Sequence, residues 1–174
     1  GAVAVVGLVV AVMSSPYRRR RVLAFLDPDG AADVNWQTSQ SLIAMGSGGL
    51  LGKGYGAGLQ KLFFLPEPHT DFILAIAGEE LGLLGVLGLI GLMAIIAWRG
   101  LRIAARQQVT SRALLAFGLT IAFAFQCLMH MAVCLDLVPP KGIPLPLISY
   151  GKTDLLVAMA SVGLLLNLSR EGRA

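Results

Sequence analysis

A polar segment bounded by prolines, residues 65–72, holds the side chains that most readily suggest chemistry. Within it lie Glu67, His69 and Asp71, and a long apolar segment follows directly. A positioned carboxylate can act as a general base, which typically accelerates a reaction by about 10²–10⁴-fold. Aspartate is also favoured at helix N-caps and near the positive end of a helix. The residues alone leave two roles open for Asp71, a catalytic base and a helix cap.

The same segment offers ligands for a metal ion. Glu67, His69 and Asp71 are candidate ligands for Mg²⁺ or Mn²⁺, because divalent cations of this kind favour oxygen-rich sites. A hydrolytic triad of His69, Thr70 and Asp71 is excluded, because a histidine cannot bridge a nucleophile and an acid at this spacing. A divalent cation is therefore the one cofactor that the sequence suggests.

Two consecutive acids, Glu79 and Glu80, lie inside the apolar segment. A charge near the centre of a membrane helix costs about 2.5–3.5 kcal/mol on insertion scales, so it usually marks function. Consecutive helix residues point roughly 100° apart, so both acids cannot face one cavity equally. We expect one to pair with a polar group of a neighbouring helix and the other to reach interfacial water.

Lys141 lies between prolines and a glycine in a second polar segment. A lone lysine near a membrane often extends its charge to the interface. A diphosphate substrate, however, needs a cation nearby, and lysine binds phosphate as a point charge. Both interpretations of Lys141 stay open at this point.

Three other side chains, Cys127, His130 and Cys134, fall on one face of a predicted helix. A packed face of a membrane helix explains this pattern better than a metal site does. The two cysteines would lie about 10 Å apart along the helix, which is too far for a disulfide.

The composition predicts an integral membrane protein. Of 174 residues, 56% are hydrophobic and 14% are charged, whereas soluble domains carry about 25% charged residues. The net charge is +4, and the arginines gather at residues 18–21, 99–112 and 170–173. They flank apolar spans instead of lining one face, which argues against a nucleic-acid partner. Under the positive-inside rule these clusters are cytoplasmic, which places Lys61 and Lys141 outside.

These elements predict an all-α fold, a polytopic transmembrane helical bundle. Between the first two arginine clusters the chain must cross the membrane twice, so the glycine-rich segment near 34–51 must span as well. The chain opens within an apolar run and lacks an initiator methionine, so we expect the C-terminal portion of something longer. The predicted spans lie near 1–13, 34–51, 72–98, 113–135 and 150–168, with extracytoplasmic loops at 53–71 and 136–152.

Five motifs together resemble the SEDS family (shape, elongation, division, sporulation), which comprises the FtsW/RodA/SpoVE proteins. They occur in the family's order and cover nearly the whole chain: YRRRR and FLDP within 17–28, QSLIAMGSGGL at 40–50, QKL and HTDF within 60–72, GEELG at 78–82, and PKG and LPLISYG within 140–151. The residues around 60–65 look more like the division branch, FtsW, than the elongation branch, RodA.

The resemblance implies about ten membrane helices, of which this chain holds the last half. It also implies polymerisation of lipid II into glycan strands outside the bacterial plasma membrane, at the division septum, with a class B penicillin-binding protein and other divisome membrane proteins as partners. Asp71 matches the family's essential aspartate and is the expected catalytic base. The expected substrate-binding residues are Lys141, Glu67, His69, Glu80 and Ser149.

The chain departs from the family pattern at three places. The family usually has Gly-Gly-Ser or Gly-Gly-Thr after the tyrosine that corresponds to Tyr150, whereas here Gly151 is followed by Lys152-Thr153-Asp154. His130 stands where an asparagine is common, and Pro140 replaces the usual threonine. Two other functions stay open beside polymerisation. One is a flippase or transporter of the same lipid, which would also need a polar cavity between broken helices. The other is a non-catalytic division scaffold, which the change after Gly151 would favour.

Overall fold

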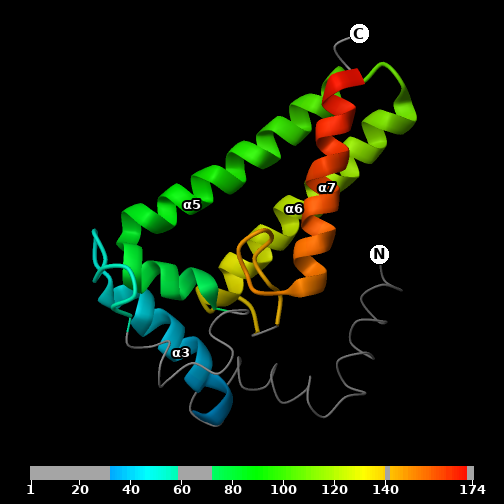
Figure 1. Cartoon of the computed structure of the whole chain (residues 1–174). Helices are drawn as coiled ribbons and strands as arrows, with labels where there is room; N and C mark the ends of the chain where they lie inside the picture. The colour runs from blue at the N-terminus through cyan, green and yellow to red at the C-terminus, as the bar shows by residue number, and fades with distance from the viewer. Residues whose placement is uncertain (1–31, 59–71, 140–141, 172–174) are drawn as a thin grey trace, which may run out of the picture.

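The computed structural model describes residues 32–58, 72–139 and 142–171 (Figure 1). These residues form four helices: α3 (Ala32–Ser47), α5 (Ile73–Arg106), α6 (Thr110–Cys134) and α7 (Lys152–Glu171). The all-α prediction is confirmed. The predicted span at 1–13, the arginines at 18–21 and most of the predicted loop at 53–71 lie outside the described residues.

Three of these helices are long and apolar enough to cross a membrane. The candidate spans are α5 with 34 residues, α6 with 25 and Lys152–Arg170 of α7 with 19, whereas crossing requires about 20. Large apolar side chains point outward along them, as contact with lipid requires. More than half of each of these residues is exposed: Leu84, Leu92, Leu114, Phe125 and Leu156. With 16 residues, α3 is not among the candidate spans, so the crossing near 34–51 stays a prediction.

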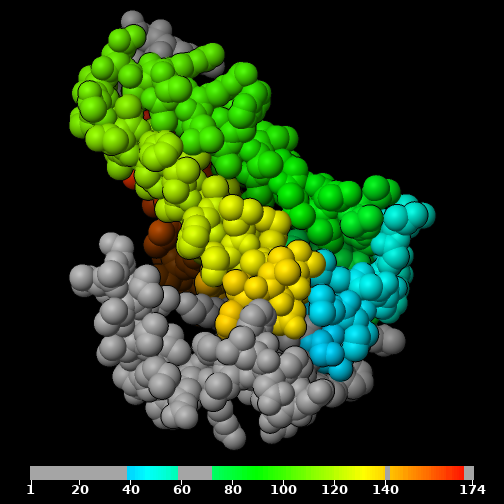
Figure 2. Space-filling model, turned by 180° about the vertical axis from the view of Figure 1, so that it is seen from behind, coloured from blue at the N-terminus to red at the C-terminus, as the bar shows by residue number. Residues whose placement is uncertain are grey.

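The helices pack in a simple order. The chain turns back after α5, so α6 runs beside α5, and α7 runs beside α6 and meets the C-terminal end of α5 (Figure 1). At Gly100 the two long helices approach so closely that a Cβ atom would collide with Thr120 of α6. Small residues allow such approach between membrane helices. The loop after α3 lies against the start of α5, as the cyan and green segments of Figure 2 show.

The long helix α5 is interrupted near its start. Gly82 has φ 69° and ψ −170°, which are not helical values, and α5 changes direction here (Figure 1). The interruption leaves the carbonyls of the preceding turn without partners inside the helix. The N–H of Lys53 donates to the carbonyl of Glu79 at 3.0 Å. The N–H of Gly54 donates to the carbonyl of Glu80 at 3.1 Å.

The second half of α5 is bonded to the same loop. The N–H of Leu83 donates to the carbonyl of Gly49 at 2.9 Å, and the N–H of Leu84 donates to the carbonyl of Leu50 at 3.2 Å. The loop after α3 thus supplies donors to one side of the interruption and acceptors to the other. In a membrane, backbone groups that a broken helix frees must find partners within the protein.

Two glycines make this contact possible. Gly52 has φ +79°, and a Cβ atom there would collide with the carbonyl of Glu80. A Cβ atom on Gly82 would collide with the N–H of Gly52 and the carbonyl of Leu50. The loop and the interrupted helix therefore approach each other backbone to backbone.

We expect Gly52→Ala to destabilise the full-length protein that carries this chain. The added methyl group would enter occupied space, and a left-handed backbone alone costs a non-glycine residue about 1–3 kcal/mol. The melting temperature of the purified protein in detergent should fall. Gly91→Ala in α5 is the control, because a Cβ atom there has nothing within 4 Å. Alanine should be tolerated at that position or stabilise the helix. Equal melting temperatures for the two variants would contradict this account of the interruption.

Candidate functional site

Most of the predicted site residues lie outside the part of the chain that the structure describes. Asp71, Glu67, His69 and Lys141 are in this group, and their predicted roles stay predictions. The structure does describe Phe72, which follows Asp71 and is almost fully buried. Phe72 takes the N-cap position of α5. Its carbonyl accepts the N–H groups of the first turn of the helix.

A buried ion pair lies at the interruption of α5. Nζ of Lys53 is 2.9 Å from Oε1 of Glu79, whose side chain is fully buried, whereas 38% of the Lys53 side chain is exposed. The ammonium group also donates to Oγ of Ser47 at 2.9 Å, and that hydroxyl donates to the carbonyl of Ala44. Lys53 therefore bonds Glu79 twice, once through its backbone and once through its side chain. One of the two acids does pair with a neighbouring segment, as expected, although the partner lies in a loop.

The second acid differs from the expectation. Only 7% of Glu80 is exposed, so it does not reach water as predicted. A Cβ atom on Gly58 would lie 3.1 Å from Oε2 of Glu79 and 3.2 Å from Oε1 of Glu80. Both carboxylates therefore approach the same glycine, although their positions on the helix suggested divergence. Gly58 is followed in the sequence by residues 59–71, which include Asp71. The two buried acids therefore lie next to the residue at which this segment begins.

The loop before α7 folds around Ser149. Oγ of Ser149 accepts the N–H of Leu145 at 2.7 Å, and the carbonyl of Leu145 accepts the N–H of Ser149 at 3.0 Å. Ser149 is 4% exposed. In the observed geometry the hydroxyl closes a turn, and its predicted contact with substrate stays a prediction.

Side chains of α6 hold this loop in place. Nδ1 of His130 is 2.8 Å from the carbonyl of Ile143, so Nδ1 is the protonated nitrogen that donates. Nε2 of His130 is 3.6 Å from Sγ of Cys134. Gln126 donates to the carbonyl of Pro144 at 3.0 Å and to Oδ1 of Asp154 at 2.6 Å. One face of α6 is thus bonded both to the loop and to the start of α7.

Metal ligation finds no support in the described ranges. No group of three histidine, cysteine or acidic side chains that could hold a metal ion occurs there. Cys127 and Cys134 are not joined in a disulfide, and Nδ1 of His130 donates to a carbonyl. The other predicted cation ligands, Glu67, His69 and Asp71, lie outside these ranges.

Sequence reasoning missed Lys53 as a site residue. The signal available was a single lysine in a glycine-rich stretch, Gly46 to Gly58, on the predicted outer side of the membrane. A buried glutamate in a membrane helix requires a counter-charge, but Lys61 and Arg99 lie nearer to Glu79 in the chain than Lys53 does, so distance along the chain does not single out Lys53.

We expect Lys53→Met to destabilise the full-length protein more than Glu79→Gln does. Removing one partner of a fully buried ion pair costs about 3–5 kcal/mol, and the partial exposure of Lys53 lowers that figure. The double variant Lys53→Met/Glu79→Gln should lose less than the sum of the two single losses, because the carboxylate is no longer charged. Melting temperatures of the four proteins measure this coupling. Lys152→Met, at an exposed position, is the control. Additive losses would show that the pair does not contribute to stability.

Comparison with known proteins identifies the family. The model of the FtsW/RodA/SpoVE family, described as cell cycle proteins, matches residues 1–174. The probable peptidoglycan glycosyltransferase FtsW of Geobacter sulfurreducens is 46% identical over 159 residues, which cover 91% of this chain and 43% of that protein. Stage V sporulation protein E of Bacillus subtilis is 41% identical, and the match covers 99% of this chain and 48% of that protein.

A solved structure also resembles this chain. It concerns the structural coordination of polymerization and crosslinking by a peptidoglycan synthase complex, with a TM-score of 0.69 and 30% identity. The match covers 98% of this chain and 47% of the solved chain. The chain thus spans about half the length of the relatives that it matches. With the family model matched from end to end, the chain belongs to the FtsW/RodA/SpoVE, or SEDS, family and is FtsW-like.

Proposed function

We propose that the protein carrying this chain polymerises lipid II into glycan strands on the outer side of the bacterial plasma membrane. The main observation in support is the interrupted span α5, whose buried acids Glu79 and Glu80 meet the loop leading to Asp71. Relatives described as probable peptidoglycan glycosyltransferases support the same reaction. Such an interruption holds polar groups at a membrane surface, where a lipid-linked substrate presents its sugars.

In this proposal Asp71 is the general base. Its carboxylate takes the proton of the 4-hydroxyl of the acceptor sugar while that oxygen attacks the anomeric carbon of the donor. The bond from that carbon to the undecaprenyl diphosphate breaks, and the configuration inverts. The diphosphate leaves as an anion, so one positioned carboxylate is enough. The position of Phe72 at the N-cap favours this role over capping.

The remaining predicted site residues would hold the substrate. Lys141 would bind the diphosphate as a point charge. The other members of this set are Glu67, His69, Glu80 and Ser149. A divalent cation, Mg²⁺ or Mn²⁺, bound by Glu67, His69 and Asp71 would neutralise further charge on the diphosphate.

Partners and place in the cell follow from the same proposal. The solved relative belongs to a complex that couples polymerization with crosslinking. We infer a class B penicillin-binding protein as the crosslinking partner, together with other divisome membrane proteins at the septum. Division is favoured over elongation by the FtsW-like identity of about 46%.

A lipid II flippase is the second candidate, because an interrupted span is also typical of transporters. A non-catalytic scaffold is the third. Strand synthesis from purified lipid II by the full-length protein with its partner separates the enzyme from both alternatives. Lipid translocation into vesicles separates the flippase from the scaffold.

Asp71→Asn should abolish polymerisation, with a loss of about 10²–10⁴-fold, because the amide cannot accept the proton. Expression and partner binding should be unchanged, because the side chain keeps its size. Asp136→Asn is the matched control, since Asp136 lies in the loop after α6 with φ 56°, which asparagine tolerates. It should polymerise at the wild-type rate. A near-normal rate for Asp71→Asn would move the base elsewhere, with Glu80 as the next residue to test.

Lys141→Ala should weaken the use of lipid II mainly through a higher KM, because the ammonium group would bind the diphosphate in the ground state as well. Lys141→Arg should keep part of the activity, since it retains the charge. The matched control is Lys152→Ala at the exposed start of α7. Wild-type kinetics for Lys141→Ala would remove the proposed role.

A further inference from the structure

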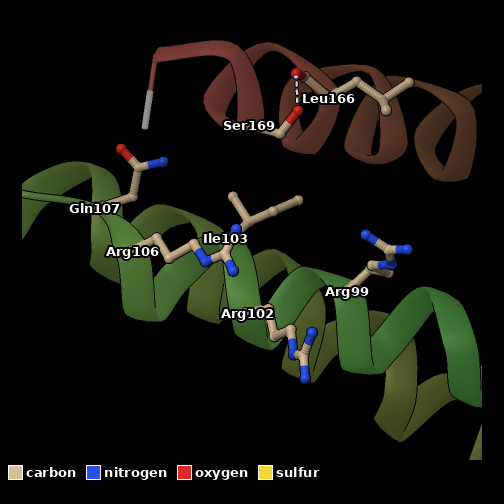
Figure 3. Close-up of a pocket in the computed structure, with 7 residues that line it drawn as sticks. All are labelled: Arg99, Arg102, Ile103, Arg106, Gln107, Leu166 and Ser169. Atoms are coloured by element: carbon tan, nitrogen blue, oxygen red, sulfur yellow. Dashed lines mark hydrogen bonds between the residues drawn. The ribbon is translucent and has the colours of Figure 1, made fainter. Parts of the chain in front are cut away.

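A second polar site lies at the opposite end of the long helices from the loops that carry the proposed active site. A cavity of about 240 Å³ opens between the last turns of α5 and α7 (Figure 3). Its lining consists of Arg99, Arg102, Ile103, Arg106, Gln107, Leu166 and Ser169. The proposed reaction uses none of these residues.

The cavity is fixed by contacts between the two helices. Nε2 of Gln107 donates to the carbonyl of Leu168 at 2.7 Å, which ties the end of α5 to α7. Beside this bond, Ala104 of α5, Ala116 of α6 and Leu165 of α7 pack in one buried cluster. Ile103 and Gln107 point from α5 toward α7 in Figure 3. The cavity therefore lies between elements that are packed together.

Three guanidinium groups share one stretch of α5. Arg99, Arg102 and Arg106 are three and four residues apart, a spacing that keeps them on neighbouring positions of one helix face. Like charges at this spacing destabilise a helix. No carboxylate lies within 4 Å of them in the described part of the chain, where the ion pair found is that of Lys53 with Glu79. All three arginines are exposed and keep their charge in proteins, so they are open to an anion from outside the chain.

The aromatic neighbour places this end at a membrane interface. The guanidinium of Arg102 lies 3.9 Å from the ring centre of Trp98, and that of Arg99 lies 5.9 Å from it. Trp98 is half exposed, and tryptophan is enriched where the membrane meets water. The positive-inside rule explains why arginines occur at this end. It does not explain why three of them line a cavity between two spans.

We propose that this cavity binds the phosphate group of an anionic phospholipid of the cytoplasmic leaflet. Basic pockets between membrane helices suit such headgroups. Arginine presents paired N–H donors that match phosphate oxygens. Ile103 and Leu166 supply an apolar wall for the first carbons of the lipid. The volume is below the roughly 300–1,000 Å³ of pockets for drug-sized ligands, which fits a headgroup and not a whole lipid.

The test measures lipid binding to the full-length protein by native mass spectrometry, with phosphatidylglycerol as the probe and phosphatidylcholine as the zwitterionic comparison. Arg99→Gln/Arg106→Gln should weaken phosphatidylglycerol binding roughly tenfold or more, given the contribution of each basic residue at an anionic surface. The matched control, Arg112→Gln/Arg170→Gln, removes the same charge from the same end without touching the cavity lining. It should bind closer to wild type than the first double variant does, because it keeps all three arginines that line the cavity. Equal losses in both double variants, or no loss in either, would overturn the proposal.

A second variant separates the cavity from the charge. Ser169→Phe keeps every arginine and fills the space, so it should also lose phosphatidylglycerol. Retained binding in this variant would overturn the proposed position. Inorganic phosphate forms the last arm. If it competes at concentrations similar to those of the lipid, the site binds free phosphate and the lipid proposal fails. If phosphatidylglycerol resists this competition, the lipid is the ligand. Melting temperatures close to wild type confirm that the variants are folded.

Discussion

The structure depends on one constraint, which is that the backbone groups at the interruption of α5 must find partners within the protein. Water is absent from a membrane interior, and each unsatisfied group there costs several kcal/mol. The loop after α3 meets this requirement by bonding both sides of Gly82. The glycines of the loop follow from the same requirement, because only a backbone without Cβ atoms approaches closely enough. The glycine-rich loop after α3 thus supplies the hydrogen-bond partners that the interrupted helix α5 requires.

The buried charges follow from the interruption. Glu79 and Glu80 lie in the last turn before Gly82, where their carbonyls bond to the loop. The loop that repairs the backbone also carries Lys53, which neutralises Glu79. The same few residues therefore supply the backbone hydrogen bonds and the counter-charge. Any movement of the loop would disturb both together, and the loop continues directly into the segment that carries Asp71.

The sequence predicted the helical class well, because runs of uncharged apolar residues determine it, and three of the described helices are long and apolar enough to span a membrane. It also predicted that one acid of α5 is paired. It could not predict that Glu79 and Glu80 approach one glycine, because a helical wheel assumes an unbroken helix and says nothing of a loop crossing it. Lys53 escaped notice for the same reason, since its partner lies 26 residues away in the chain. The arginine cavity required the packing of α7 on α5, which periodicity within each helix cannot supply.

The departures from the family pattern have a structural use. His130 donates to the carbonyl of Ile143, and Asp154 accepts from Gln126, which also donates to the carbonyl of Pro144. Two of the unusual residues therefore help to hold the loop that carries Lys141. The sequence at 152–154 suggested a weakened site, since it replaces glycine with charged residues. In the structure, Oδ1 of Asp154 accepts from Gln126, which also bonds the loop, whereas Oδ2 of Asp154 is buried with no hydrogen-bond partner in the described part of the chain. A loop that is fixed by such bonds can bind substrate as well as a flexible loop can. These substitutions therefore do not favour the scaffold over the enzyme.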